Sequence, residues 1–295
     1  MRKKFMMLMI IMVMISSGVL AQQGNRQNRN DHDKHDGNDK EKRDRGLKIF
    51  ALTSDQRLIR FYEDDPSDSK SVGTVSGLDT DETLVGIDFR VQDGLLYGLG
   101  SKGNIYTINT TDATAVFVNA LTVALDGTAF AIDFNPAADR LRIVSNTGQN
   151  LRHDVTAGAT TEDADLNYPT DPPTTATDVA GIAYTNNDVD PDTATTLYDI
   201  DANLDQVVIQ SPPNTGALAA TGKLTVDTTP VVGFDIYSVI SDGVAVGTKA
   251  FASLTTDQGK VKLYEIDLLT GKATKRGKFN TDDQVIDLAI PLDQH

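Results

Sequence analysis

The 295-residue sequence contains no cysteine. Disulfides, thiol catalysis, zinc–thiolate sites and iron–sulfur clusters are therefore excluded, as is a lipid anchor on a cysteine behind the leader. A domain without disulfides must be stabilised by its own core or by bound ions. All six methionines lie within residues 1–14.

Histidine is scarce as well, with four in the sequence. Two precede residue 46 and one ends the chain, so only His153 remains for the folded part. Multi-histidine metal sites are excluded, and a Ser-His-Asp triad would have to use His153. Strand alternation places His153 on the apolar face with Leu151 and Val155. The pattern favours a partly buried strand histidine over a catalytic base.

Positive charge is the third deficit, because the formal net charge is −15. Residues 46–295 carry 17 basic and 36 acidic side chains. Nucleic acid is not expected as a partner because phosphate binding needs a positive stripe, and anionic membranes are disfavoured too. This acidity is typical of a soluble extracellular protein and is compatible with cation binding.

The N-terminus has the pattern of a secretory signal. Three basic residues precede an apolar run over residues 5–15, which is too short for a membrane span, and Val19-Leu20-Ala21 supplies a cleavage site. Residues 22–45 contain no large apolar side chain, which predicts a disordered charged linker. We therefore expect a signal peptide over residues 1–21, cleaved near Ala21, a linker over residues 22–45 and one domain over residues 46–295. The protein should be exported, either secreted or periplasmic.

One apolar segment recurs five times after residue 46, at intervals of 45 to 54 positions. This interval is the length of one propeller blade. Each interval contains short β-type runs separated by turns rich in Gly, Asn and Asp, and helical periodicity is missing. The copies are VGIDF (85–89), FAIDF (130–134), AGIAY (180–184), VGFDI (232–236) and DLAI (287–290).

The first repeat is split between the two ends of the chain. The runs KIFAL (48–52), LIRFY (58–62) and VGTV (72–75) match the second to fourth strands of a unit, and DLAI at the other end supplies the missing first strand. The sequence therefore predicts an all-β fold, a β-propeller with five four-stranded blades closed by pairing of the N- and C-terminal strands. Five blades are favoured over six because no sixth copy is found.

Several longer stretches resemble a known bacterial family. They include VGIDFRVQDGLLYGLGSKGNIYTI, FNPAADRLRIVSNTGQNLR and TTLYDIDANLDQVVIQSPPNTGAL. Together with YTNN and GFDI they are similar to the family named domain of unknown function 4394, over nearly all of residues 48–291. The resemblance implies an exported propeller-like domain and no particular activity. His153 departs from the aliphatic residue or Asn expected at its position, which argues against a shared catalytic role.

Acidic residues supply two candidate metal sites. Asp88, Asp133 and Asp235 occupy the same place in the first strand of three repeats, while Ala183 and Ala289 occupy it in the other two. In a propeller this strand lines the central channel, where converging carboxylates could hold Ca²⁺ or a polar ligand. Alternatively, each Asp accepts hydrogen bonds from its own blade and the neighbouring turn.

The second candidate is the loop NNDVDPDTATTLYD. It places Asp188, Asp190 and Asp192 at alternate positions, as at the start of a calcium loop. The Gly wanted at the sixth position is replaced by Thr193. An acidic surface loop is the alternative interpretation.

Three arginines are the only basic residues between Gly103 and Gly222: Arg140, Arg142 and Arg152. They fall on adjacent strands of one predicted blade. We expect inter-blade ion pairs with Asp88 and Asp133, because guanidinium groups bind carboxylates bidentately. The alternative is an anion pocket for a carboxylate, sulfate or acidic sugar, which would make these arginines a ligand-binding site.

The sequence leaves three functions open, one of which is a plain structural role in the envelope with no ligand. The first is an exported binding or scaffold module for a small ligand, a glycan or a surface protein, which the lack of a nucleophile–base pair favours. The second is a carboxylate- and divalent-metal-dependent hydrolase or lactonase in the central channel. Ca²⁺ is the only cofactor that the sequence suggests, and it does not identify the ligand, the binding rim or the oligomeric state.

Overall fold

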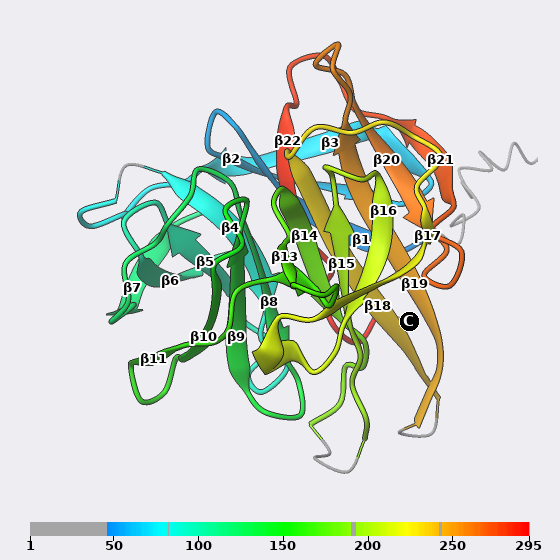
Figure 1. The fold of residues 1–295 in the computed structure, drawn as a ribbon. Coiled ribbons are helices and arrows are strands. Elements are labelled where there is room, and N and C mark those ends of the chain that lie inside the picture. Colours follow the sequence, from blue (N-terminus) through cyan, green and yellow to red (C-terminus); the bar gives the residue numbers. More distant parts are fainter. Residues whose placement is uncertain (1–45, 82, 190–192, 242–243, 295) are drawn as a thin grey trace, which may run out of the picture. The chain divides into compact units, whose positions relative to one another are not determined.

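The computed structural model describes residues 46–81, 83–189, 193–241 and 244–294. Five four-stranded antiparallel sheets form a five-bladed β-propeller (Figure 1). In the described residues the only helical element is the short 3₁₀ turn η1 (Pro213–Thr215). The expected signal peptide and linker lie outside these residues.

Each blade is a meander whose first strand lines the channel. Blade 1 consists of β22 (Val285–Ala289), β1 (Lys48–Thr53), β2 (Arg57–Tyr62) and β3 (Asp65–Thr74). Blade 2 consists of β4 (Leu84–Phe89), β5 (Leu96–Gly100), β6 (Asn104–Ile108) and β7 (Ala115–Ala120). Blade 3 consists of β8 (Phe130–Asn135), β9 (Arg140–Ser145), β10 (Asn150–Asp154) and β11 (Ala159–Glu162). Blade 4 consists of β14 (Val179–Tyr184), β15 (Leu197–Asp201), β16 (Gln206–Gln210) and β17 (Leu218–Lys223). Blade 5 consists of β18 (Val232–Ser241), β19 (Val244–Thr255), β20 (Val261–Ile266) and β21 (Ala273–Lys278).

The two ends of the folded chain complete one sheet. Strand β22 pairs with β1 in antiparallel register, with Phe50 opposite Ala289 and Ala51 opposite Leu288. This pairing confirms the predicted closure. Because a closed ring leaves no long unpaired inner edge, the fold needs no further element to protect it.

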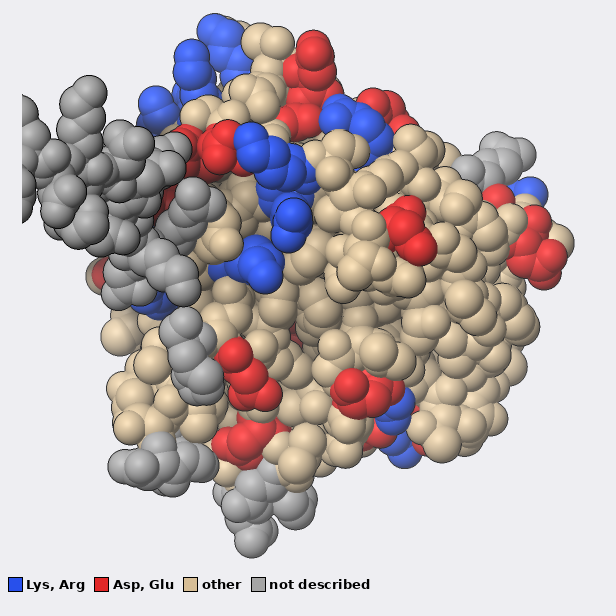
Figure 2. Space-filling view, turned by 180° about the vertical axis from the view of Figure 1, so that it is seen from behind, with Lys and Arg blue, Asp and Glu red and all other residues tan. Residues whose placement is uncertain are grey.

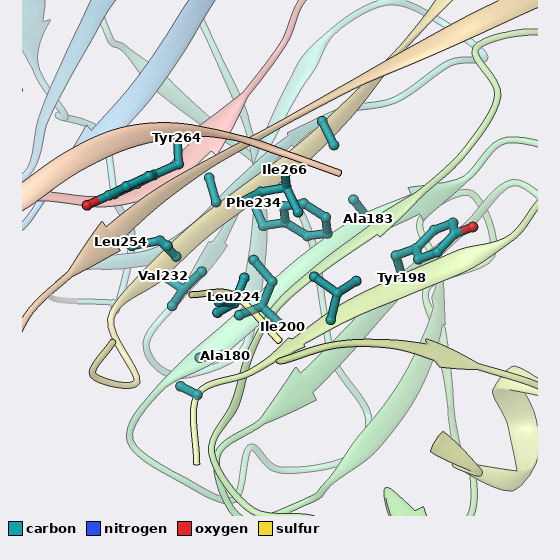
Figure 3. Packing of buried hydrophobic residues seen from close by; sticks show 14 of the residues in the cluster. Ala180, Ala183, Tyr198, Ile200, Leu224, Val232, Phe234, Leu254, Tyr264 and Ile266 are labelled. Atoms are coloured by element: carbon teal, nitrogen blue, oxygen red, sulfur yellow. The ribbon is translucent and has the colours of Figure 1, made fainter. Parts of the chain in front are cut away.

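Apolar side chains form five buried clusters, one at each junction between neighbouring blades. Figure 3 shows the cluster between blades 4 and 5, where Ile200 and Phe234 meet. Strand alternation explains this arrangement, since successive side chains of a blade point to the neighbour on either side. The core is therefore divided among the junctions.

The inner strands approach one another closely at two glycines of the recurring segment. A Cβ atom on Gly233 would lie 2.6 Å from backbone atoms of Asp287, and one on Gly181 would lie 2.8 Å from the Cβ atom of Phe234. A larger residue at either place would push neighbouring inner strands apart. Glycine thus sets the width of the channel.

Two features differ from a simple repeat. The β18–β19 hairpin extends well beyond the VGFDI segment, with strands of 10 and 12 residues. The proline-rich connector between blades 3 and 4 contains a small sheet of β12 (Asn167–Tyr168) and β13 (Thr174–Thr175). Both features place additional backbone around blade 4.

Candidate functional site

The inner strands are tied together by carboxylates that reach from one blade to the next. Asp88 on β4 accepts a hydrogen bond from the backbone N–H of Phe134 on β8, at 2.7 Å. Asp133 on β8 accepts one from Tyr184 on β14, at 3.0 Å. The geometry repeats because the inner strands of neighbouring blades are in the same register. Each aspartate therefore faces the residue that follows the equivalent position in the next blade.

Blade 5 continues the series. Asp235 on β18 accepts the N–H of Ile290 at 2.6 Å and that of its own neighbour Ile236 at 2.6 Å. These aspartates thus accept hydrogen bonds, as one of the two expectations held, but the donors differ from those expected: three lie on or directly after the inner strand of the next blade, and only Ile236 lies on the same blade as its aspartate.

A fourth carboxyl, Asp287 on β22, was missed by the sequence comparison. It accepts the N–H of Ile87 at 2.7 Å and that of Leu288 at 2.9 Å. Alignment of the repeats placed Ala289 opposite the other aspartates, and Asp287 lies two positions earlier. Because side chains alternate along a strand, Asp287 lies on the same side of β22 as Ala289. The sequence therefore contained a signal by which Asp287 could have been found.

Blade 4 alone has no carboxyl in this ring. Its inner strand carries Ala183 at the equivalent position, and the contact with blade 5 is made two residues beyond the end of β14. There the backbone N–H of Asn186 donates to the hydroxyl of Ser238 at 2.8 Å. The junction between blades 4 and 5 is therefore joined differently from the other four.

The four carboxyls occupy a strongly desolvated environment, each being 5–6 % exposed. Burial is the main cause that raises the pKa of Asp88, Asp133 and Asp287 well above the usual carboxyl range, and the neighbouring carboxylates add to the effect. Burial also raises the pKa of Asp235 to about 7. No Lys or Arg in the described part of the chain forms an ion pair with any of the four.

Three of the carboxyls converge closely enough to share one ion. One oxygen each from Asp88, Asp133 and Asp235 lie within 4.8 Å of one another. A Ca²⁺ ion bound at 2.3–2.6 Å from its ligands brings oxygens to such separations. Asp133 Oδ2 accepts no hydrogen bond from the residues that the structure describes, although the side chain is 95 % buried.

One mouth of the channel is apolar. A cavity of about 250 Å³ is lined there by residues at the start of the inner strands. Each blade contributes one equivalent side chain, namely Val85, Phe130, Ala180, Val232 and Ile286. The aspartate cluster lies three residues further along each strand, which corresponds to about 10 Å. The apolar mouth and the carboxyl cluster are therefore separate layers of the channel.

The three arginines form ion pairs, but not with the expected partners. Arg142 is 2 % exposed and donates to Asp163 at 2.7 Å, to Asn150 at 2.7 Å and to Asn214 at 2.9 Å. Arg152 binds the same Asp163 through two hydrogen bonds, at 2.6 and 2.9 Å.

Arg140 pairs with Asp154 at 2.9 Å. The predicted pairing of the arginines with Asp88 and Asp133 is therefore wrong. Asp163 directly follows β11 of the same blade, and Asn214 lies in η1, between β16 and β17 of blade 4. The donors of Arg142 are occupied by protein groups, which favours the fold-stabilising interpretation over an anion pocket.

The acidic loop behind β14 is only partly described. Asp190 and Asp192 lie outside the described residues, and the backbone N–H of Asp188 donates to Asn186 at 3.1 Å. Among the described residues Asp188 does not belong to a group of converging metal ligands. Calcium binding by this loop stays a prediction.

His153 lies in a buried polar contact between blades. Its ring nitrogens are 3.0 Å from Thr160 Oγ1 and 2.9 Å from Asn119 Oδ1, and burial lowers the pKa of the imidazole. Both nitrogens are engaged by neutral partners, which is the environment of a structural histidine.

Surface charge is uneven. Figure 2 shows Lys and Arg gathered on the side of β20 and β21, while much of the remaining visible face carries no charge. Strand β21 exposes Lys275, Arg276 and Lys278. Glu63 neutralises part of this charge, since it lies 2.9 Å from Lys249 and 3.9 Å from Arg276. No helix in the described residues is long and apolar enough to cross a membrane.

The chain belongs to the family described as domain of unknown function DUF4394, which it matches over residues 57–289. No curated protein matches the sequence.

Among solved structures, an auxiliary nutrient binding protein from Bacteroides thetaiotaomicron is 10 % identical with a TM-score of 0.47, covering 85 % of this chain and 62 % of that one. A protein of unknown function from the same organism is 15 % identical with a TM-score of 0.43, covering 78 % and 57 %. Myxococcus xanthus glutaminyl cyclase is 12 % identical with a TM-score of 0.38, covering 70 % and 69 %. The chain thus spans less than two thirds of the first two structures, and similarities this weak carry no information about function.

Proposed function

We propose that this protein is an exported binding module whose propeller holds a divalent cation, best matched by Ca²⁺, in the central channel. The observation that carries the proposal is the convergence of Asp88, Asp133 and Asp235, with oxygens within 4.8 Å of one another. Export is supported by the leader pattern.

Charge balance supports an ion at this place. Carboxylates in a dry environment are strongly disfavoured unless they are protonated, paired with a cation or bound to a metal. No Lys or Arg of the described residues forms an ion pair with these carboxyls. Backbone N–H groups donate hydrogen bonds to only some of the carboxylate oxygens. Ca²⁺ accepts carboxylate ligands in flexible geometry and completes its shell with water, so three protein oxygens are a sufficient start.

The test is metal binding by the purified protein after removal of bound ions with a chelator. Calorimetry with Ca²⁺ should give saturable binding of one ion, and Ca²⁺ should raise the melting temperature. Asp133→Asn should abolish both effects, because it removes the charge of one of the three converging carboxyls and keeps an oxygen for the Tyr184 N–H. Asp257→Asn is the matched control on the exposed surface. If Ca²⁺ gives neither heat nor a thermal shift, or if both variants behave alike, the proposal fails.

A metal-dependent hydrolase in the same channel is the second candidate. One observation favours it: three carboxyls converge in the channel, and a divalent ion held by such a cluster could activate a bound water for hydrolysis. Hydrolysis of a chromogenic aryl ester should then depend on Ca²⁺ and be lost in Asp235→Asn. If hydrolysis is equally fast with and without Ca²⁺, the metal-dependent hydrolase is rejected and the binding module remains.

A further inference from the structure

Three lysines lie together on one face of the two outer strands of blade 5. Lys262 on β20 is directly opposite Lys278 on β21, and Tyr264 on β20 is directly opposite Lys275. Lys275 and Lys278 are exposed, and Lys262 is half-buried. Neighbouring strands lie about 5 Å apart and two residues span about 7 Å along a strand, so these three side chains, the lysine cluster, start close enough together to contact one ligand.

A β-bulge brings both lysines of β21 to the same face. In a regular strand Lys275 and Lys278 would point to opposite faces, because they are three positions apart. The register of β20 and β21 shifts at this place, and Arg276 is the extra residue. Arg276 lies 3.4 Å from Glu265 and 3.9 Å from Glu63. By alternation Glu265 is on the other face of the sheet, so these two acidic side chains neutralise that face and not the lysine cluster.

The lysine cluster has no counter-charge of its own. None of its three side chains forms an ion pair with an acidic residue in the part of the chain that the structure describes. Like charges directly opposite each other on neighbouring strands destabilise a sheet. The protein has acidic residues in large excess, yet none is placed at this face. An anionic partner would remove the repulsion that Lys262 and Lys278 impose on the fold.

Tyr264 adds a hydroxyl beside the lysine cluster. The side chain is 5 % exposed and packs in the apolar cluster between blades 4 and 5. Its hydroxyl makes no hydrogen bond with any described residue, and Figure 3 shows it at the outer end of the ring, pointing away from the apolar side chains. A phenolic O–H donates well to an anionic oxygen.

The rest of the protein selects among anionic partners. Because residues 46–295 are strongly acidic, a flat anionic membrane would bring other acidic surface within the screening distance of about 8–10 Å. Single-stranded nucleic acid needs exposed aromatic rings for stacking, and the ring of Tyr264 is buried. A polysaccharide chain with acidic groups is thin enough to contact the lysine cluster alone, and it needs only positive charge and hydrogen bonds there.

We propose that the lysine cluster and Tyr264 bind an acidic polysaccharide through its carboxylate or sulfate groups. The lysine side chains pair with these groups, and the Tyr264 hydroxyl donates a hydrogen bond to one of them. This surface is independent of the proposed cation site, because the converging aspartates lie on the inner strands β4, β8 and β18.

The test is binding of the intact protein to dextran sulfate and to polygalacturonate at low salt with a chelator present, with unsubstituted dextran as the uncharged comparison. At least one acidic polysaccharide should bind, more weakly as salt is added, and dextran should not bind. The triple variant Lys262→Gln, Lys275→Gln, Lys278→Gln should weaken binding about tenfold, because three exposed ion pairs are lost. Its melting temperature should not fall, since the substitutions remove like-charge repulsion.

A second triple variant, Lys70→Gln, Lys102→Gln, Lys223→Gln, is the matched control. It changes the net charge by the same amount on blades 1, 2 and 4 and should bind like the wild type. The proposal is overturned if neither acidic polysaccharide binds, if dextran binds equally well, or if both triple variants weaken binding by the same factor. Tighter binding to phosphatidylglycerol vesicles or to a single-stranded oligonucleotide than to either polysaccharide would overturn it as well.

Discussion

Asp287 Oδ2 accepts the backbone N–H of Ile87 at 2.7 Å, a contact between residues 200 positions apart. It joins the last strand of the chain to the first strand of blade 2, at the junction between blades 1 and 2. The same kind of contact, carboxylate to backbone of the next blade, occurs at three other junctions. These aspartates therefore act in closure of the ring as well as in the proposed cation site.

Removal of the Asp287 acceptor should destabilise the ring. Asp287→Ala leaves the buried N–H of Ile87 unpaired, whereas Asp287→Asn keeps an oxygen at the same place. We expect the alanine variant to be less stable than the asparagine variant by about 1–3 kcal/mol. Urea unfolding at pH 7 measures the difference. Equal stability of the two variants would show that the hydrogen bond does not hold blades 1 and 2 together.

Stability of the metal-free protein should depend on pH through the channel. The folded-state pKa of Asp235 is about 7, above the value near 3.9 expected in the unfolded chain. The folded state therefore holds its proton more tightly, so the stabilisation is complete below pH 4 and is lost as pH rises to 7. Each proton bound only by the folded state contributes about 1.4 kcal/mol per pH unit.

Urea unfolding between pH 4 and 7 in the presence of a chelator measures this slope. Asp235→Asn should make stability fall less steeply with pH, while Asp257→Asn on the exposed surface should leave the slope unchanged. Asp88, Asp133 and Asp287 shift in the same direction, so a negative slope should remain in the Asp235 variant. A steeper fall in that variant would mean that folding lowers the pKa of Asp235 instead of raising it.

The fold was predictable because the repeat is visible in one inner-strand segment. Equal register also predicted that Asp88, Asp133 and Asp235 converge. Asp287 escaped prediction because it lies two positions out of register, and only the hydrogen bond to Ile87 shows its role. A comparison of repeats finds residues at equivalent positions. It does not find a side chain such as Asp287, which makes the same kind of hydrogen bond from a position two residues away.

Contacts made by loops could not be predicted from the sequence for a different reason. Two partners of Arg142, Asp163 and Asn214, lie after β11 and on the η1 turn, where no periodic pattern fixes the path of the backbone. A cavity between blades 4 and 5, lined by Tyr198 and Thr248, depends on the length of the β18–β19 hairpin, which the VGFDI segment does not reveal. Strand registers follow from alternation, whereas the meeting of two loops follows only from the folded structure.

The two arginines on β9 should differ sharply in their contribution to stability. Arg142 is buried and its removal leaves Asn150, Asn214 and part of Asp163 unsatisfied, so Arg142→Met should cost about 3–5 kcal/mol. Arg140 is partly exposed in its pair with Asp154, so Arg140→Met should cost at most about 1 kcal/mol. Urea unfolding of both variants makes the comparison, and equal losses would show that the buried network around Arg142 adds no stability.

The close approach of the inner strands can be tested by replacing one of the glycines that lie between them. A Cβ atom on Gly233 would lie 2.6 Å from the backbone of Asp287, whereas one on Gly247, in the outer part of β19, would have no atom within 4 Å. Gly233→Ala should lower the free energy of unfolding by about 1–3 kcal/mol or more, because backbone of blade 1 must move to admit the methyl group. The same change at Gly247 should be neutral or slightly stabilising, since alanine restricts the unfolded chain. Because both residues lie in the same β18–β19 hairpin, strand propensity is matched between them and the difference reports the packing of the channel. If both variants unfold at the same urea concentration, neighbouring inner strands have room to separate and the glycine does not set the width of the channel.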